Sequence, residues 1–171
     1  MEKILIVDDD KDIQIALSEI IKTEGYEAIV AGDGRKALKE IRTHAPDLVL
    51  LDLKLPGMDG MEVLEEIKKI DSDIVVIMLT GYGGIKSAVQ AMRLGAFDYL
   101  TKPFAYKEIV LTIKKAVQVR YFNKATKSSS NSDKGIDITK ITGESSQIKE
   151  VLSKVEMVAP TNMTVIIQGE S

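Results

Sequence analysis

The segment Pro46–Gly60, with the sequence PDLVLLDLKLPGMDG, decides how this chain is expected to fold. Leu48–Leu51 is uninterrupted by polar residues, which is typical of a strand buried on both faces of a parallel sheet. Asp52 follows directly, so its carboxylate is expected at the carboxyl end of a central strand. Leu55–Gly57 then breaks the chain, and Met58–Met61 begins an amphipathic segment. In open α/β sheets, ligands and chemistry lie at such strand ends, although an acid there could also simply cap a turn.

Similar units repeat on both sides of this segment. Short apolar or β-rich runs predict strands at residues 4–7, 27–31, 48–51, 74–79 and 97–101. Apolar residues at helical spacing predict a helix after each strand, over residues 13–25, 37–44, 61–67, 85–95 and from 106 to about 124. Five β-then-α units predict an α/β fold, a (βα)5 doubly wound parallel sheet with the flavodoxin-like strand order 2-1-3-4-5 and a C-terminal helical extension.

That strand order places Asp8 and Asp9, after the first strand, beside Asp52, after the third. Three carboxylates at one edge repel one another unless a cation lies among them. Hard oxygen ligands suit Mg²⁺, for which Mn²⁺ can substitute. Asp52 could then act as a nucleophile toward a phosphoryl donor. Lys102, after the fifth strand, and Thr80, ending the fourth, supply a cation and a hydroxyl for phosphoryl oxygens.

Each residue also has a simpler explanation. Thr80 could be an ordinary β-branched strand residue, and Lys102 a solvated loop charge. The acids Asp8–Asp10 could complement a helix dipole, and for Asp10 we expect this role alone. The occurrence of four suitable polar residues at four strand ends favours the chemical interpretation.

Four motifs together resemble a known family: Asp8-Asp9, the segment Asp52–Gly60, Thr80-Gly81, and Tyr99–Phe104. They are similar, in order and spacing, to the receiver (CheY-like) domain of two-component response regulators. The resemblance covers about the first two-thirds of the chain. One departure is Gly81, where many receivers have Ala; it leaves space beside Thr80.

The resemblance implies a role for each matching residue. Asp52 would be the phosphoacceptor, Asp9 a direct Mg²⁺ ligand and Asp8 a ligand largely through water. The backbone carbonyl of Lys54 would complete the metal ligands contributed by the chain.

The resemblance also implies a switch. Lys102 would pair with the phosphoryl group, Thr80 would move toward it, and Tyr99 would turn inward in response. The Lys102–Pro103 bond would be cis. Lys54 and Tyr82 occupy positions that tune dephosphorylation, so the phosphoryl lifetime stays open.

The rest of the chain suggests a longer regulator. We expect a receiver over residues 1–120 and a linker over 121–140 that is helical at first, then Ser-rich and flexible. Residues 141–171 are similar to the opening of the AAA+ domain of sigma-54-dependent transcriptional activators of the NtrC type. Gly169 would be the first glycine of a Walker A loop whose Lys lies beyond the chain. We therefore expect no ATP hydrolysis, and DNA and sigma-54 RNA polymerase as partners only through regions absent here.

Composition excludes other classes. The 171 residues contain no Cys and one His, and carry a net charge of −3. Disulfides, thiolate chemistry and a nucleic-acid surface are therefore not expected. The single histidine, His44, is expected to be a solvated residue at a helix end. Without an apolar run approaching the ~20 residues that span a bilayer, we expect no membrane association and a cytoplasmic location.

Partners follow from the same resemblance. The phosphoryl donor would be a sensor histidine kinase, and the final helix and linker, with Tyr121 and Phe122, would form a homodimer. The leading alternative is a metal-dependent phosphohydrolase that uses Asp52 as nucleophile. Lys54 counts against it, because haloacid-dehalogenase enzymes need an Asp two residues after the nucleophile. A flavodoxin-like cofactor binder is disfavoured by the acidic rim, which would repel a flavin phosphate.

Overall fold

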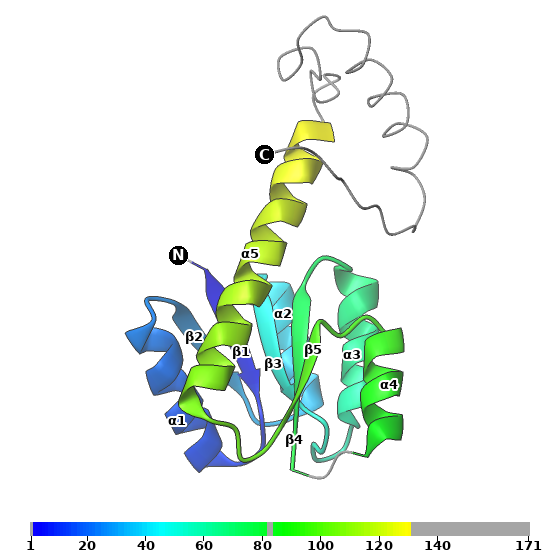
Figure 1. Ribbon diagram of the computed structural model, residues 1–171. Coiled ribbons are helices and arrows are strands. Elements are labelled where there is room, and N and C mark those ends of the chain that lie inside the picture. Colours follow the sequence, from blue (N-terminus) through cyan, green and yellow to red (C-terminus); the bar gives the residue numbers. More distant parts are fainter. Residues whose placement is uncertain (1, 82–83, 131–171) are drawn as a thin grey trace, which may run out of the picture. The chain divides into compact units, whose positions relative to one another are not determined.

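The computed structural model describes residues 2–81 and 84–130, and the fold within them alternates strands and helices (Figure 1). The elements are β1 Lys3–Val7, α1 Lys11–Thr23, β2 Glu27–Ala31, α2 Gly34–His44, β3 Leu48–Asp52, α3 Gly60–Ile70, β4 Val75–Thr80, α4 Ile85–Arg93, β5 Asp98–Thr101 and α5 Tyr106–Ser130. The strands form one sheet in the order β2-β1-β3-β4-β5, and every neighbouring pair is parallel. The predicted fold class and strand order are confirmed.

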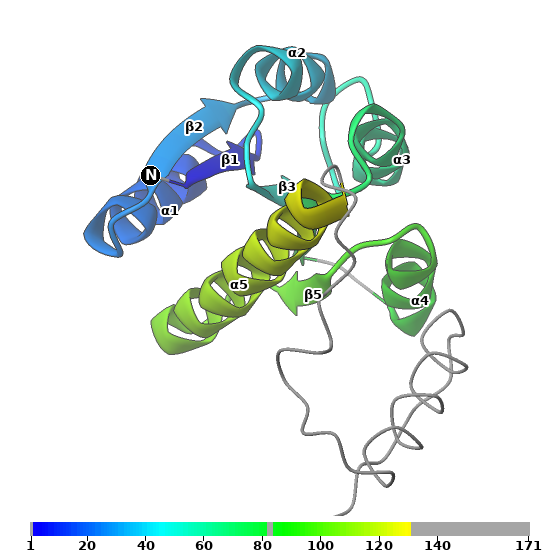
Figure 2. The same ribbon diagram turned by 90° about the horizontal axis from the view of Figure 1, so that it is seen from above.

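The helices lie in two layers, α1 and α5 on one face of the sheet and α2, α3 and α4 on the other (Figure 2). The central strands bury side chains in both layers. Val49 and Leu51 belong to the core beneath α2 and α3, whereas Leu48 and Leu50 belong to the core beneath α1 and α5. All four side chains are fully buried. Two buried faces leave no place for a polar residue, which explains the unbroken apolar run.

Parallel register brings the carboxyl ends of the strands to one edge. Val7 pairs with Leu51, Asp52 pairs with Leu79, and Thr80 pairs with Thr101. Residues that directly follow β1 and β5, and the last residues of β3 and β4, therefore share this edge.

Polar residues cap the helices. Asp10 begins α1 and accepts hydrogen bonds from the backbone N–H groups of Asp12 and Ile13, at 2.8 and 3.4 Å. This is the capping role expected of it. Gly25 and Gly95, expected to close two helices, have φ of +86° and +91° and lie just after the last turns of α1 and α4. Only glycine adopts this backbone conformation without strain.

Helix α5 continues past the length expected from its sequence, to Ser130. Helical spacing in the sequence predicts one apolar stripe of Tyr106, Val110, Ile113, Val117 and Tyr121. Val110 and Ile113 lie in the core, but Tyr106 and Tyr121 are 51% and 70% exposed. Arg120, with 7% exposure, is instead the last buried residue of α5 within its part up to Lys124, where burial is described. It follows Ile113 by seven residues, or about two helical turns, so it faces the sheet as Ile113 does, whereas Tyr121 is rotated away.

One cluster of charged residues, Arg120, Lys124, Asp47 and Asp71, holds this part of α5 to the rest of the fold. Arg120 Nη2 donates to Asp71 Oδ2 at 2.9 Å, and Arg120 Nε lies 3.7 Å from Asp47 Oδ1. Asp47 also accepts hydrogen bonds from Lys124 Nζ and, at 3.1 Å, from the backbone N–H of Lys3. These contacts fasten α5 at the amino edge of the sheet, opposite the edge that carries Asp52.

The expected later part of the linker, residues 131–140, and the expected ATPase segment, residues 141–171 with Gly169, lie outside the described residues. Among the helices that are described, none is both long enough and apolar enough to cross a bilayer.

Candidate functional site

The carboxyl edge of the sheet gathers the acidic residues singled out from the sequence. Asp8 and Asp9 follow β1, and Asp52 ends β3. Each offers a carboxylate oxygen, and these oxygens all lie within 4.8 Å of one another. Asp8 is fully buried and Asp52 is 7% exposed, whereas Asp9 is exposed. The topology thus brings Asp52, which is distant in sequence, into one cluster with the neighbouring Asp8 and Asp9.

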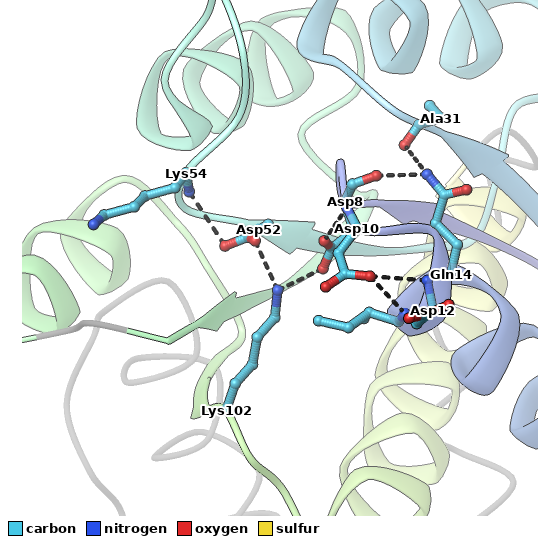
Figure 3. A network of polar contacts seen from close by, with 9 residues as sticks. Asp8, Asp10, Asp12, Gln14, Ala31, Asp52, Lys54 and Lys102 are labelled. Carbon is cyan, nitrogen blue, oxygen red and sulfur yellow. Dashed lines mark hydrogen bonds and ion pairs between the residues drawn. The ribbon is translucent and has the colours of Figure 1, made fainter.

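The Lys102 side chain ends between two of these carboxylates (Figure 3). Its Nζ donates to Asp8 Oδ2 at 2.5 Å and to Asp52 Oδ2 at 2.7 Å. The side chain is only 15% exposed, so it is not a solvated loop charge. Burial alone would lower the pKa of Lys102, but the hydrogen bonds to Asp52 and Asp8 and their charges outweigh burial and raise that pKa. Lys102 is therefore held in its charged form.

Asp8 is held by groups on both sides. Its Oδ1 accepts the backbone N–H of Asp10 at 3.0 Å, and its Oδ2 accepts from Lys102. Burial is the largest influence and raises the pKa of Asp8, although the two hydrogen bonds act in the opposite direction. A divalent cation near the cluster would favour the charged carboxylate.

Asp52 is positioned by the loop that follows it. Its Oδ1 accepts the backbone N–H of Lys54 at 3.2 Å, and the N–H of Leu53 donates to Leu79 of β4 at 2.9 Å. Gly60, at the start of α3, donates its N–H to the Leu53 oxygen at 2.9 Å. A Cβ on Gly60 would overlap the Asp52 carbonyl oxygen and lie 2.8 Å from Leu53 Cα. Glycine therefore allows the loop to close tightly beneath the carboxylate.

The two residues assigned to the switch lie on adjacent strands. Thr80, at the end of β4, is 1% exposed, and its backbone oxygen accepts the N–H of Lys102 at 2.6 Å. Tyr99 lies in β5, and its hydroxyl is 3.0 Å from Ser87 Oγ in α4. A Cβ added to Gly81 would meet no described atom within 4 Å, which agrees with the space expected beside Thr80. Tyr82 lies outside the described residues.

The bond between Lys102 and Pro103 is cis, as the resemblance implied. His44 ends α2 and pairs with Glu40 through Nδ1 at 2.9 Å, far in the fold from the acidic cluster. Its expected role as a residue at a helix end agrees with this position.

Sequence reasoning missed two residues beside the site. Gln14, in the first turn of α1, donates its side-chain N–H groups to the backbone oxygens of Asp8 and Ala31. Ser87 contacts Tyr99, as described above. Neither belongs to a motif, and only the packing of α1 and α4 on the sheet reveals them.

The donor set fits a hard divalent cation. Asp8, Asp9 and Asp52 offer carboxylate oxygens only, on one buried and one open side. Mg²⁺ is bound by one or two carboxylates with waters and phosphate oxygens completing an octahedron. The buried Asp8 and Asp52 supply carboxylate ligands, and the exposed side at Asp9 leaves room for waters and phosphate oxygens.

Comparison with known proteins identifies the arrangement. The sequence pattern described as "Response regulator receiver domain" matches residues 4–114. The chain belongs to the response regulator receiver family. The receiver spans the strands and helices that carry Asp8, Asp52, Thr80 and Lys102, so the resemblance inferred from the sequence is confirmed.

Curated relatives support this placement. The receiver chain is 44% identical over 119 residues to sporulation initiation phosphotransferase F of Bacillus subtilis, covering 70% of this chain and 96% of that protein. It is 35% identical over 169 residues to the transcriptional regulatory protein ZraR of Escherichia coli K12, covering 98% of this chain. The chain spans 37% of the length of ZraR.

Solved structures agree with the fold. A CheY-like receiver domain from Methanospirillum hungatei superposes with a TM-score of 0.70 at 33% identity, covering 72% of this chain and 98% of that one. NtrX from Brucella abortus, solved in complex with ADP, gives a TM-score of 0.69 at 36% identity over 95% of this chain and 35% of that one. The similarity to regulators of the NtrC type, expected from the sequence, is supported by NtrX and ZraR. Receivers of this family are phosphoacceptors in two-component systems rather than classical enzymes.

Proposed function

We propose that this receiver accepts one phosphoryl group from a sensor histidine kinase on Asp52, in the presence of Mg²⁺. The observation that carries the proposal is the position of Lys102 Nζ, 2.5 and 2.7 Å from Asp8 and Asp52. A cationic side chain held at the acceptor carboxylate can stabilise the negative charge of the phosphoryl oxygens during transfer.

The transfer requires little from the protein beyond placement. An oxygen of Asp52 attacks phosphorus as the bond from phosphorus to the kinase histidine nitrogen breaks, and that nitrogen keeps the electron pair. Asp8, Asp9, Asp52 and the backbone carbonyl of Lys54 would hold Mg²⁺, with Mn²⁺ as a substitute. The bound cation supplies neutralisation of the phosphoryl charge. The acyl phosphate is then lost slowly to water, so turnover is not the purpose of the site.

The conformational response involves Thr80 and Tyr99. The Thr80 hydroxyl would donate to a phosphoryl oxygen, and Tyr99 would leave its contact with Ser87 and turn inward. The response would reach the surface formed by α4 and β5, because Ser87 belongs to α4. A switch of this kind needs a local charge change and an element with two positions.

The output would be control of an attached sigma-54 activator ATPase. Support comes from the similarity to ZraR and NtrX over 98% of this chain. DNA and sigma-54 RNA polymerase would be contacted by other parts of such a regulator.

We further propose that a second copy of the chain covers the exposed side of α5. Tyr121 and Phe122 are 70% and 68% exposed, and Val119 is 37% exposed. These apolar residues lie on the part of α5 that is fastened to the sheet through Arg120, so the helix presents them in a fixed orientation. Two such helices packed side by side would bury them as a short coiled coil does. A monomer mass that stays constant with rising concentration in light scattering would refute the dimer, and Tyr121→Ser with Phe122→Ser should produce that result.

The experiment that tests the phosphoacceptor is intact-protein mass spectrometry after incubation with acetyl phosphate and Mg²⁺. Wild type should gain one phosphoryl group, whereas Asp52→Asn, or wild type with the metal chelated, should gain none. The alternative, a metal-dependent phosphohydrolase, predicts many turnovers of a phosphate ester without a lasting adduct. Lys69→Met, at an exposed lysine of α3, serves as a surface control and should gain the phosphoryl group as wild type does.

A further inference from the structure

The side-chain amide of Gln14 ties two strand ends together beside the acidic cluster. Its Nε2 lies 2.5 Å from the backbone oxygen of Asp8 and 3.4 Å from that of Ala31 (Figure 3). The backbone N–H of Asp8 donates to the same Ala31 oxygen at 3.1 Å. One partly buried side chain therefore links the last residue of β2 to the residue that follows β1.

The oxygen held by Gln14 belongs to the peptide bond between Asp8 and Asp9. A peptide unit is planar, so holding its oxygen also fixes the direction of the Asp9 N–H and the place of the Asp9 Cα. The Asp8 carboxylate is held separately, by Asp10 and Lys102. Asp9 is exposed. The orientation of this peptide plane therefore determines the direction in which the Asp9 side chain leaves the backbone.

We propose that Gln14 is a positioning residue for the Asp8–Asp9 pair. The proposal rests on the metal site proposed above and adds a residue that contacts neither the cation nor the phosphoryl group. Without the amide, the carbonyl of the fully buried Asp8 would have to turn toward another donor, because a buried carbonyl without a hydrogen bond is unfavourable. That rotation would move the Asp9 carboxylate away from the carboxylates of Asp8 and Asp52.

The test is the Mg²⁺ affinity of the purified chain, measured by isothermal titration calorimetry. Gln14→Met keeps the length of the side chain and removes both donors, and Gln14→Leu is a second variant with the same purpose. Affinity should fall roughly tenfold or more, as it does when hydrogen bonds that orient metal ligands are removed. The matched control is Gln90→Met, the same exchange at an exposed position of α4, which should bind Mg²⁺ as wild type does.

Circular dichroism at the titration temperature establishes that each variant is folded. In Gln14→Met the amide ¹H and ¹⁵N shifts of Asp9 and Asp10 should change, a local effect that general loss of stability would not produce. Wild-type affinity in a folded Gln14 variant overturns the positioning role. Failure of the wild-type chain itself to bind Mg²⁺ would overturn the metal site, which is a separate result.

Discussion

Arg120 Nη2 lies 2.9 Å from Asp71 Oδ2 and joins α5 to the end of α3. Arg120 is buried and lies close to Asp47 as well, so its removal takes a cation from two carboxylates, although Lys124 still pairs with Asp47. We expect Arg120→Met to lower the free energy of unfolding by about 3 kcal/mol, the lower end for a broken buried ion pair, because Asp71 is partly exposed.

Urea unfolding followed by circular dichroism measures this loss. The control is Lys69→Met, which breaks the exposed pair between Lys69 and Glu66 and should cost less than about 1 kcal/mol. Equal losses in the two variants would show that the Arg120 cluster contributes no more than a surface pair.

Asp47 should make stability depend on pH. Burial is the largest influence on Asp47 and would raise its pKa, but the Lys124 and Lys3 hydrogen bonds, with the Lys124 and Arg120 charges, outweigh it and lower the pKa. The folded state then binds this proton less readily than the unfolded state. The stabilisation is complete above the ordinary pKa of 3.8 and is lost as pH falls through the lower folded value.

The measurement is the difference in unfolding free energy between wild type and Asp47→Asn at pH 6 and at successively lower pH. The advantage of wild type should be largest at pH 6 and shrink below about pH 4. A difference that stays constant to the acid limit would mean that Asp47 has no lowered pKa in the folded chain.

Lys102 and the proposed divalent cation would compete for the same carboxylates. Replacing Lys102 by Met removes a positive charge 2.5 Å from Asp8 and 2.7 Å from Asp52. Mg²⁺ affinity should rise about fivefold, since even in water two charges about 4 Å apart interact by about 1 kcal/mol. The amount of phosphorylated protein should fall, because the cation that meets the phosphoryl oxygens is gone.

Calorimetric titration of Lys102→Met at low ionic strength gives the affinity, and mass spectrometry gives the phosphorylated fraction. Lys36→Met, at an exposed lysine of α2, controls for the change in net charge. Reduced Mg²⁺ affinity in Lys102→Met would show that Lys102 supports the cation rather than competing with it.

Tyr99 and Ser87 should be coupled by their 3.0 Å contact. A double-mutant cycle of Tyr99→Phe and Ser87→Ala should give a coupling energy of about 1 kcal/mol in the unphosphorylated chain, the usual net value of one hydrogen bond. Repeating the cycle on the chain with Asp52 phosphorylated should give a value near zero if Tyr99 turns inward. A coupling energy that is unchanged by phosphorylation would contradict the proposed movement.

The fold and the gathering of the acidic residues at one edge could be predicted because they depend on patterns that repeat along the chain. The apolar run before Asp52 reports burial on both faces of the sheet, and five such units fix a topology that places Asp8 beside Asp52. Lys102 follows from the same reasoning, because it directly follows the fifth strand. These relations need only the order of the elements.

Contacts between elements could not be predicted in the same way. The contacts of Gln14 and Ser87 depend on how closely a helix packs against a strand. The periodicity of the sequence does not predict that distance. Arg120 shows the limit most clearly. From the sequence, a charged residue such as Arg120 is expected at the edge of the buried stripe, and Tyr121 is expected to continue the stripe. In the structure the helical period places Arg120 against the sheet, and its charge is compensated there by Asp47 and Asp71.

The close approach of Gly60 to the backbone of Asp52 means that the proposed acceptor cannot be treated as one residue. A side chain at position 60 would overlap the strand end that carries the carboxylate. Asp52 therefore keeps its position only together with the glycine at position 60. Grafting Asp52 onto another parallel sheet would require β3, the loop and the first turn of α3 to be transferred together. The proposed chemistry therefore belongs to a strand, a loop and a helix start together, and not to the carboxylate alone.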